Sequence, residues 1–412
     1  MGKKKTIVIL SDSPTIPTGY RNQSVQLAQH LHKNGWEVHF LANGYMGSDI
    51  EHLILKGGEE FNYKIYGHGQ SDQYFNKTMS RRLKELNADV FLVLLDTFML
   101  YPWFLNVDTS PAKTIFYYPS DGGGGLPKGC EAILNKIDQP VSMARFGQKQ
   151  VKDYYGIDVR HIPHCVDSKS FYPLEKEEKE KLKAKYGLSG KYVVGVVARN
   201  QPRKNLDRTI KAMRLIADQI PNAVLFLHLD PNDPAQPMWK ISDLVKKYNL
   251  ENRVIYSGMS AFNGFPQCEM NGVYNVMDCF LLTTSGEGFG VPIIEAMSCE
   301  IPVVATDYTT TPELVIENKA GLGIKLTGVE ELDLFALDSK DYDKESFNGT
   351  QTGSWEVERG ICDIKHAASQ IKFLFDNPET SKMMGKNGRK AVLEKYDDKI
   401  VCKQWEDLLN EK

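Results

Sequence analysis

The sequence GEGFGVPIIEAM at residues 286–297 joins a glycine-broken loop to an apolar helix, with one carboxylate on the loop (Glu287) and one on the helix (Glu295). Glycines let backbone N–H groups approach an anion, and Pro292 suits the first turn of a helix whose positive dipole end faces that anion. Carboxylates hold phosphate poorly but accept hydrogen bonds from hydroxyls well. The stretch therefore predicts a site for a diphosphate placed between two polyols, as in a nucleotide sugar. Taken alone, it could also be a glycine-rich turn with solvent-exposed acids.

A pair of basic residues occurs upstream of this stretch. An apolar, β-branched run at 192–198 ends at Arg199, and after a break the chain resumes as a helix from Lys204. A parallel strand brings Arg199 to the carboxyl edge of its sheet, and the turn brings Lys204 back to the same edge, where open α/β sheets bind ligands. The two cations are expected to face the diphosphate. By itself, the pair could equally be solvated surface charge.

Together, the basic pair and the glycine-rich stretch resemble the sequence pattern of glycosyltransferase family 4, whose members are retaining enzymes of the GT-B fold. Glu287 and Glu295 match the E-x7-E signature of that family, and Arg199 and Lys204 match its R-x4-K arrangement. Further matching segments are 162–167 (IPHCVD), 301–306 (IPVVAT) and 312–315 (PELV). The resemblance covers the C-terminal half of the chain densely and the N-terminal half thinly.

The resemblance implies a role for each of these residues. Arg199, Lys204 and backbone amides of the loop would stabilise the negative charge that grows on the leaving nucleoside diphosphate. Glu287 would hold hydroxyls of the transferred sugar, and Glu295 would hold the ribose hydroxyls of the nucleotide. The residues expected to bind the donor are Gly19, Gly288, Phe289, Gly290, Val291 and Glu295.

One departure from the family pattern concerns the first domain. Many relatives carry a His at the end of a first-domain strand, whereas no His lies between His68 and His161 here. The predicted strand 114–118 is instead followed by Asp121 and four glycines, which would free the backbone to approach a ligand. Asp121 is therefore the fourth predicted catalytic residue, placed opposite Glu287 to hold a sugar hydroxyl or take the acceptor proton. Asp96 is its competitor, and for either residue the structural alternative is a helix N-cap.

Predicted strands and helices alternate along the chain, which is the pattern of a parallel sheet covered by helices. Strands are expected at 6–10, 37–42, 90–95, 114–118 and 139–143, and again at 192–198, 223–229, 253–257, 279–283, 302–305 and 322–326. The predicted fold class is α/β, with two Rossmann-like, doubly wound parallel-sheet domains that face each other across a cleft, as in GT-B.

Changes in composition set the expected domain boundaries. The first domain is predicted at 1–170, and by resemblance to GT-B it is joined by the C-terminal helix at 397–412. The charge-rich stretch 171–190 is predicted to be a linker containing a solvated helix. The second domain is predicted at 191–396, with a polar, turn-rich insertion near 327–355. Helices are expected after this insertion, at 361–375 and 382–395.

The overall composition is consistent with these expectations. A chain of 412 residues exceeds what one hydrophobic core serves, and its net charge of -3 gives no reason to expect nucleic acid as a partner. Seven cysteines without a C-x-x-C spacing indicate reduced thiols in a cytoplasmic protein. No apolar stretch reaches the length of a membrane span. The predicted location is cytoplasmic or peripheral at a membrane surface, and the oligomeric state stays open.

The predicted reaction moves a hexosyl group from a UDP- or GDP-linked sugar to a carbohydrate, lipid or other hydroxyl acceptor, with retention of the anomeric configuration. No cofactor or metal site is predicted, because the basic pair can neutralise the diphosphate in place of Mg²⁺ and the only Asp-x-Asp, at 341–343, lies in the polar insertion. The alternatives are a GT-B sugar-nucleotide epimerase and a non-catalytic nucleotide-sugar binding protein.

Overall fold

The computed structural model describes residues 4–55, 58–101, 103–126, 129–231, 239–260, 265–331 and 357–411. The chain divides into two compact units. Unit 1 consists of residues 1–164, 331–358 and 399–412, and unit 2 consists of residues 165–330 and 359–398.

Unit 1 is built on a seven-stranded parallel sheet in the order β5-β2-β1-β6-β7-β8-β9. Its strands are β1 (Thr6–Asp12), β2 (Glu37–Asn43), β5 (Lys64–Tyr66), β6 (Val90–Leu94), β7 (Lys113–Tyr118), β8 (Gln139–Ser142) and β9 (Arg160–His161), and a short hairpin is formed by β3 (Leu53–Ile54) and β4 (Glu60–Phe61). The central strand β1 is buried over its first six residues, which explains its apolar sequence. The chain order reverses between β1 and β6, so their carboxyl ends form the switch point of this sheet.

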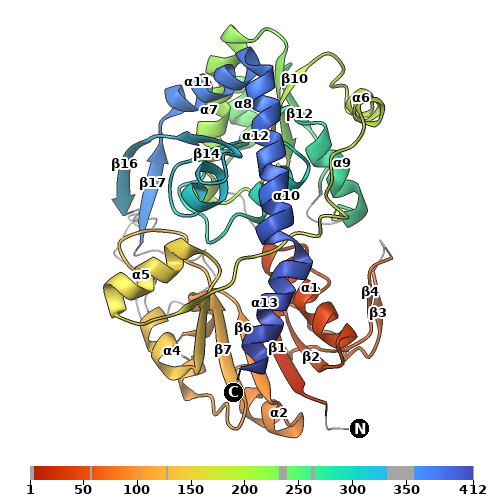
Figure 1. Cartoon of the computed structure of the whole chain (residues 1–412), viewed down its shortest axis with the longest axis vertical. Helices are drawn as coiled ribbons and strands as arrows, with labels where there is room; N and C mark the ends of the chain where they lie inside the picture. Colours follow the sequence, from red (N-terminus) through yellow and green to blue (C-terminus); the bar gives the residue numbers. More distant parts are fainter. Residues whose placement is uncertain are drawn as a thin grey trace. The chain divides into compact units, whose positions relative to one another are not determined.

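Helices cover both faces of the unit 1 sheet, as Figure 1 shows. One face packs against α2 (Met79–Glu85), α4 (Cys130–Lys136) and α5 (Arg145–Tyr155), and α1 (Gly19–Lys33), α3 (Thr97–Leu100) and α13 (Asp398–Asn410) complete the unit. On α13, Trp405 is buried and packs edge to face against Tyr117 of β7, with ring centroids 4.9 Å apart. Glu406 of α13 pairs with His30 of α1 at 3.0 Å. The C-terminal helix is therefore packed on the sheet next to α1.

Unit 2 is built on a six-stranded parallel sheet in the order β12-β11-β10-β13-β14-β15. Its strands are β10 (Tyr192–Val197), β11 (Ala223–His228), β12 (Val254–Tyr256), β13 (Cys279–Leu282), β14 (Val303–Thr306) and β15 (Gly321–Ile324). The chain order reverses between β10 and β13, so the switch point of this sheet lies at their carboxyl ends. The sheets of both units confirm the predicted doubly wound architecture.

The helices of unit 2 are α6 (Lys176–Lys185), α7 (Leu206–Gln219), α8 (Ile241–Lys247), α9 (Met270–Asn275), α10 (Val291–Ser298), α11 (Ile364–Asp376) and α12 (Pro378–Ala391). The helix predicted at 361–375 begins too early. Residues Glu358–Cys362 form strand β17, which pairs with β16 (Leu326–Glu331). The helix begins after Asp363, whose carboxylate accepts hydrogen bonds from the N–H groups of Lys365 and His366. The predicted insertion near 327–355 thus starts within a strand, and residues 332–356 lie outside the described part of the chain.

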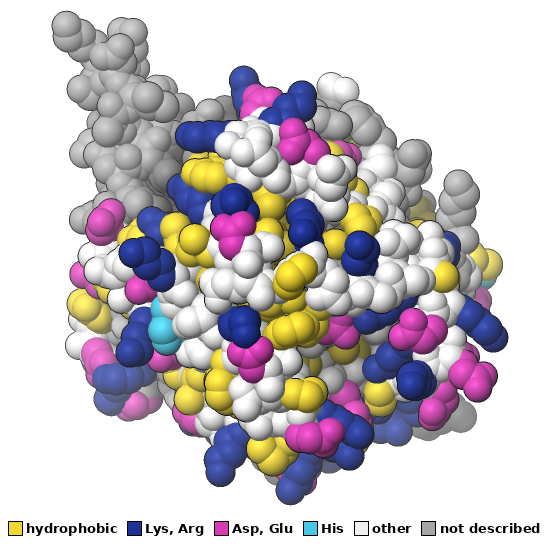
Figure 2. Space-filling model, turned by 90° about the horizontal axis from the view of Figure 1, so that it is seen from above, with side chains coloured by type: hydrophobic (Ala, Val, Ile, Leu, Met, Phe, Trp, Pro, Cys, Tyr) yellow, Lys and Arg dark blue, Asp and Glu magenta, His cyan; other side chains and the backbone are white. Residues whose placement is uncertain are grey.

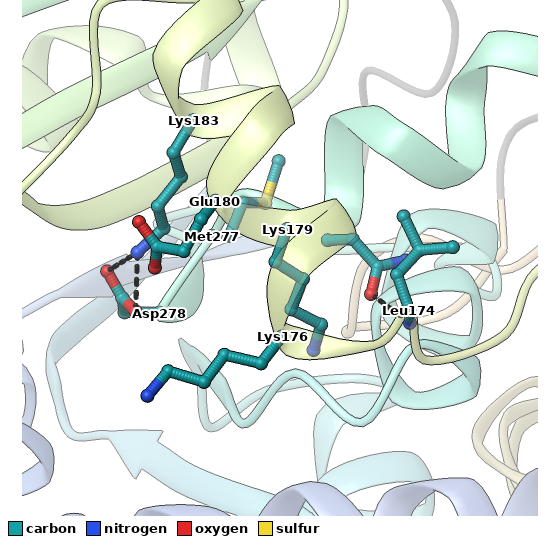
Figure 3. A pocket seen from close by; sticks show the side chains of 8 residues that line it. Leu174, Lys176, Lys179, Glu180, Lys183, Met277 and Asp278 are labelled. Atoms are coloured by element: carbon teal, nitrogen blue, oxygen red, sulfur yellow. Dashed lines mark hydrogen bonds and ion pairs between the residues drawn. The ribbon is translucent and has the colours of Figure 1, made fainter.

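The charge-rich helix α6 has no buried residue, as its sequence predicted. It packs beside β13 through Lys183, whose ammonium contacts both carboxylate oxygens of Asp278 at 3.0 Å. A pocket of about 290 Å³ lies beside this ion pair (Figure 3). Its lining residues are Leu174, Lys176, Lys179, Glu180, Lys183, Asn275, Met277 and Asp278. Partial burial lowers the pKa of Lys179 in this pocket.

The structure also shows the state of the cysteines and the distribution of charge on the surface. All seven cysteines are free, and only Cys268 is exposed. In the space-filling view of Figure 2, basic and acidic side chains are interspersed over the visible face. Within the described ranges, no helix is both long and apolar enough to cross a membrane.

Candidate functional site

Two loops meet at the switch point of the unit 2 sheet. One is the short turn Pro202–Lys204 after β10, and the other is the loop 283–290 after the neighbouring strand β13. The carbonyl oxygen of Arg203 accepts hydrogen bonds from the N–H of Ser285 at 2.7 Å and from the hydroxyl of Thr284 at 3.1 Å. The hydroxyl of Thr283 donates to the carbonyl of Asn205 at 3.1 Å. These bonds fix the loop that carries Glu287 against the turn that carries Lys204.

The carboxylate of Glu287 lies between two cations. Lys204 donates from Nζ to Oε1 at 2.6 Å, and Arg203 donates from Nη1 to Oε2 at 2.9 Å. Glu287 is only 4% exposed, so the alternative of solvent-exposed acids in this loop is wrong. Burial alone would raise its pKa, but the charges of Arg203 and Lys204 outweigh that effect and lower the pKa to about 2. Glu287 is therefore ionised at neutral pH.

The second carboxylate, Glu295, lies in a different environment. It projects from α10, is 7% exposed and accepts a hydrogen bond from the hydroxyl of Tyr274 at 2.5 Å. Burial raises its pKa to about 7, and the hydrogen bond from Tyr274 offsets this only in part. Near neutral pH, Glu295 is thus divided between a neutral carboxyl group, which can donate one hydrogen bond, and a carboxylate, which only accepts.

The glycine-rich loop leads directly into α10. Gly290 has a φ of +102°, which side chains rarely adopt, and it is the N-cap of the helix. Pro292 lies in the first turn, as predicted. Phe289 is buried against Tyr396 with ring centroids 6.1 Å apart, and its carbonyl accepts a hydrogen bond from Thr310. The backbone amides at Gly288 and Val291 flank this turn, where the helix dipole favours an anion.

The remaining predicted residues lie at other positions. Arg199 follows β10 by two residues, with an exposed side chain at the same sheet edge as Lys204. Gly19 and Asp121 belong to unit 1, where Gly19 is the first residue of α1 and Asp121 follows β7. The structure thus joins Lys204 to Glu287 on the glycine-rich loop at one edge of the unit 2 sheet, while Arg199 follows β10 and Glu295 lies on α10. The roles of all these residues, and of Gly19 and Asp121, stay predictions.

The glycines after Asp121 serve a structural purpose. A Cβ at Gly122 would lie 2.7 Å from the carbonyl oxygen of Glu358, and the backbones of Gly123 and Glu358 exchange two hydrogen bonds of 2.9 and 3.0 Å. These glycines therefore let another stretch of unit 1 approach closely. The competitor Asp96 makes no side-chain N-cap bond to α3, and it accepts a hydrogen bond from Tyr20 at 2.6 Å.

Comparison with known proteins gives a family match over part of the chain. Residues 178–333 match the family model of the glycosyl transferases group 1. Mannosylfructose-phosphate synthase of Agrobacterium fabrum is 28% identical over 37% of this chain and 34% of its own length. A GDP-mannose-dependent alpha-(1-6)-phosphatidylinositol monomannoside mannosyltransferase of Mycolicibacterium smegmatis is 24% identical over 48% of this chain and 52% of its own length.

Solved structures resemble the chain over almost its full length. Sucrose-phosphate synthase from Thermosynechococcus elongatus has a TM-score of 0.72 at 19% identity, and the match covers 98% of both chains. Anabaena Alr3699/HepE, solved in complex with UDP and glucose, has a TM-score of 0.71 at 15% identity over 98% of this chain and 99% of its own. The fold is GT-B. Over residues 178–333, which lie mainly in unit 2, the chain matches the group 1 glycosyl transferases.

Two residues that contact the predicted carboxylates, Arg203 and Tyr274, were not predicted from the sequence. Arg203 follows Pro202 in the same turn as Lys204, so its charge and position could be read from the sequence. It is one of the four unspecified positions of the R-x4-K pattern, so the pattern assigns it no role. No sequence pattern indicated Tyr274, because it lies on α9 and its contact with Glu295 of α10 depends on how the two helices pack. Among the described residues, no group of three or more His, Cys, Asp and Glu side chains is placed to hold a metal ion, and the Asp-x-Asp at 341–343 lies outside them.

The raised pKa of Glu295 predicts a specific dependence of stability on pH. Its folded-state pKa of about 7 lies above the ordinary value of 4.5, so between these pH values the native state binds a proton that the unfolded state has lost. The free energy of unfolding should therefore fall as pH rises through this window, by about 3 kcal/mol from this group, since one pKa unit corresponds to about 1.4 kcal/mol.

Glu295→Gln keeps an acceptor for Tyr274 and removes this titration. In urea unfolding experiments, the variant should gain stability relative to the wild type between pH 4.5 and 7 and hold that gain up to pH 8. Parallel pH profiles for the two proteins would show that Glu295 titrates as an ordinary carboxyl group.

Proposed function

We propose that this protein transfers a hexosyl group from a nucleotide-diphosphate sugar to a hydroxyl acceptor, with retention of the anomeric configuration. The observation that supports this most is the buried Glu287 carboxylate between Lys204 and Arg203, next to the glycine loop that begins α10. The combination provides cations and oriented N–H groups for a diphosphate, with an ionised carboxylate for sugar hydroxyls beside them. An ion pair that served only as solvated surface charge would not require Glu287 to be buried.

The proposed chemistry breaks the bond between the anomeric carbon of the donor and the oxygen of its β-phosphate. It forms a bond from that carbon to the acceptor oxygen, and the proton of the acceptor hydroxyl passes to the leaving diphosphate. Negative charge then grows on the leaving nucleoside diphosphate, and Lys204, Arg199 and the amides near Phe289 and Gly290 stabilise it. Each oxygen of Glu287 accepts one bond from a cation and keeps a second lone pair, so the carboxylate can still accept a hydrogen bond from a sugar hydroxyl. Glu295 takes the ribose hydroxyls.

The names of the related proteins agree with this chemistry. The mycobacterial relative is described as GDP-mannose-dependent, and the Anabaena structure contains UDP and glucose. The alignments with the first two curated relatives span about a third and about half of their lengths, so the donor base, the sugar and the acceptor of this chain are not carried over from them.

A donor screen followed by product analysis tests the proposed function. A nucleoside diphosphate or nucleotide sugar held at 100 times its dissociation constant should stabilise the protein by roughly 2.7 kcal/mol in thermal unfolding. The nucleotide sugar that binds should then yield a glycosylated product whose anomeric proton, followed by NMR, has the configuration of the donor. An inverted product would contradict the proposed reaction. An altered sugar nucleotide without transfer would indicate an epimerase, and binding without turnover a binding protein.

Removal of either predicted cation should reduce turnover. We expect Lys204→Ala and Arg199→Ala to lower the rate at saturating donor by about 10²- to 10³-fold, the usual loss for one contact to a developing negative charge. Lys211→Ala is a matched control, because Lys211 pairs with Asp207 within α7. Thermal unfolding checks that each variant is folded. Near-normal turnover in a folded Lys204 or Arg199 variant would remove that residue from the diphosphate site.

We further propose that transfer needs no divalent metal, because Lys204 and Arg199 supply the positive charge that a metal ion would provide. Excess EDTA should leave most of the initial rate, measured with donor and acceptor at saturation. Complete loss of activity that Mg²⁺ or Mn²⁺ restores would show that a metal ion takes part.

A further inference from the structure

Arg203 contacts the Glu287 loop through both its side chain and its backbone. Its guanidinium donates from Nη1 to Glu287 Oε2 at 2.9 Å and to the carbonyl of Gly286 at 3.1 Å. Its own carbonyl accepts from the N–H of Ser285 at 2.7 Å and from the hydroxyls of Thr284 and Ser285 at 3.1 Å each. Arg203 is therefore attached to the loop at several points through its side chain and backbone, whereas the side chain of Lys204 contacts Glu287 through its ammonium group.

The proposed reaction makes two demands on Lys204. In the structure its ammonium contacts Glu287 at 2.6 Å, and during transfer it must stabilise the leaving diphosphate. If Lys204 were the only counter-ion, its movement would leave a carboxylate that is 4% exposed without a partner, and an unpaired buried charge is strongly unfavourable. A second cation that stays on Glu287 removes this conflict.

We propose that Arg203 is a positioning residue that keeps Glu287 ionised and in place while Lys204 turns from Glu287 to the diphosphate. This inference rests on the proposed function. The guanidinium suits the task because its fixed fork of donors spans a carboxylate and a carbonyl at the same time, while an ammonium carries the charge without that fixed geometry. The bond to Gly286 also holds the loop backbone immediately before Glu287.

The test is a double-mutant cycle with Arg203→Gln, Glu287→Gln and both changes together. The measured quantities are the dissociation constant of UDP or GDP, whichever binds the wild type, by calorimetry, and kcat and KM with the donor. Arg203→Gln should weaken binding about 10-fold, because Lys204 is then held by Glu287, and residues in direct contact show coupling of this size. In the Glu287→Gln background, Lys204 has no carboxylate to neutralise, so Arg203→Gln should have no further effect on binding.

Two further measurements separate positioning from a general structural role. Arg203→Gln should move the acid limb of the kcat/KM profile to higher pH, because Glu287 loses a charge that lowers its pKa. Arg203→Lys should return that limb toward the wild type, since it restores the charge. Arg214→Gln, which removes an exposed arginine paired with Asp218 on α7, is the matched control and should change neither binding nor the pH profile.

The outcomes are distinct. Equal weakening by Arg203→Gln in both backgrounds would show that Arg203 contacts the diphosphate itself and would overturn the positioning role alone. An acid limb that does not move in Arg203→Gln would also overturn it. A wild type that binds neither nucleoside diphosphates nor nucleotide sugars would overturn the proposed function and this inference with it.

Discussion

The charge balance around Glu287 is the constraint on which the site depends. A carboxylate that is 4% exposed is stable only if its charge is compensated, and two cations from one turn provide that compensation from both sides. The same contacts join the turn after β10 to the loop after β13, two strands that are neighbours in the sheet and distant in sequence. The ion pairs therefore fix the geometry of the switch point as well as its charge.

The two carboxylates of one short sequence motif differ in charge because their neighbours differ. Glu287 has Arg203 and Lys204 within hydrogen-bonding distance, and its pKa is lowered to about 2. Among the described residues, the hydrogen-bond partner of Glu295 is the neutral hydroxyl of Tyr274, so burial dominates and the pKa of Glu295 rises to about 7. Environment rather than residue type thus assigns the two groups different chemistry. The eight-residue spacing matters because it places one group on the loop and the other on the helix.

Much of the fold was predictable from sequence because parallel strands buried on both faces read as apolar runs. The run at 192–198 became β10, and the alternation of such runs with helices gave two doubly wound sheets. The last two residues of strand β17, Ile361 and Cys362, were assigned to the following helix, because nothing local shows that this short strand pairs with the distant β16. In the site, Lys204 and the glycine loop followed from spacing at a strand end. The contact of Tyr274 with Glu295 could not be predicted from the sequence, because it depends on how two helices pack.

The protonation states determine where an anion is favoured at this sheet edge. Glu287 carries one negative charge and is matched by Lys204 and Arg203, which leaves one positive charge in excess, and Arg199 at the same edge adds another. Burial raises the pKa of Glu295, which favours its neutral form and reduces the negative charge that it contributes. The amides that begin α10 add a partial positive charge at the same place. The burial that raises the pKa of Glu295 and the cations that compensate Glu287 thus act in the same direction, because each reduces the uncompensated negative charge that this motif would otherwise carry.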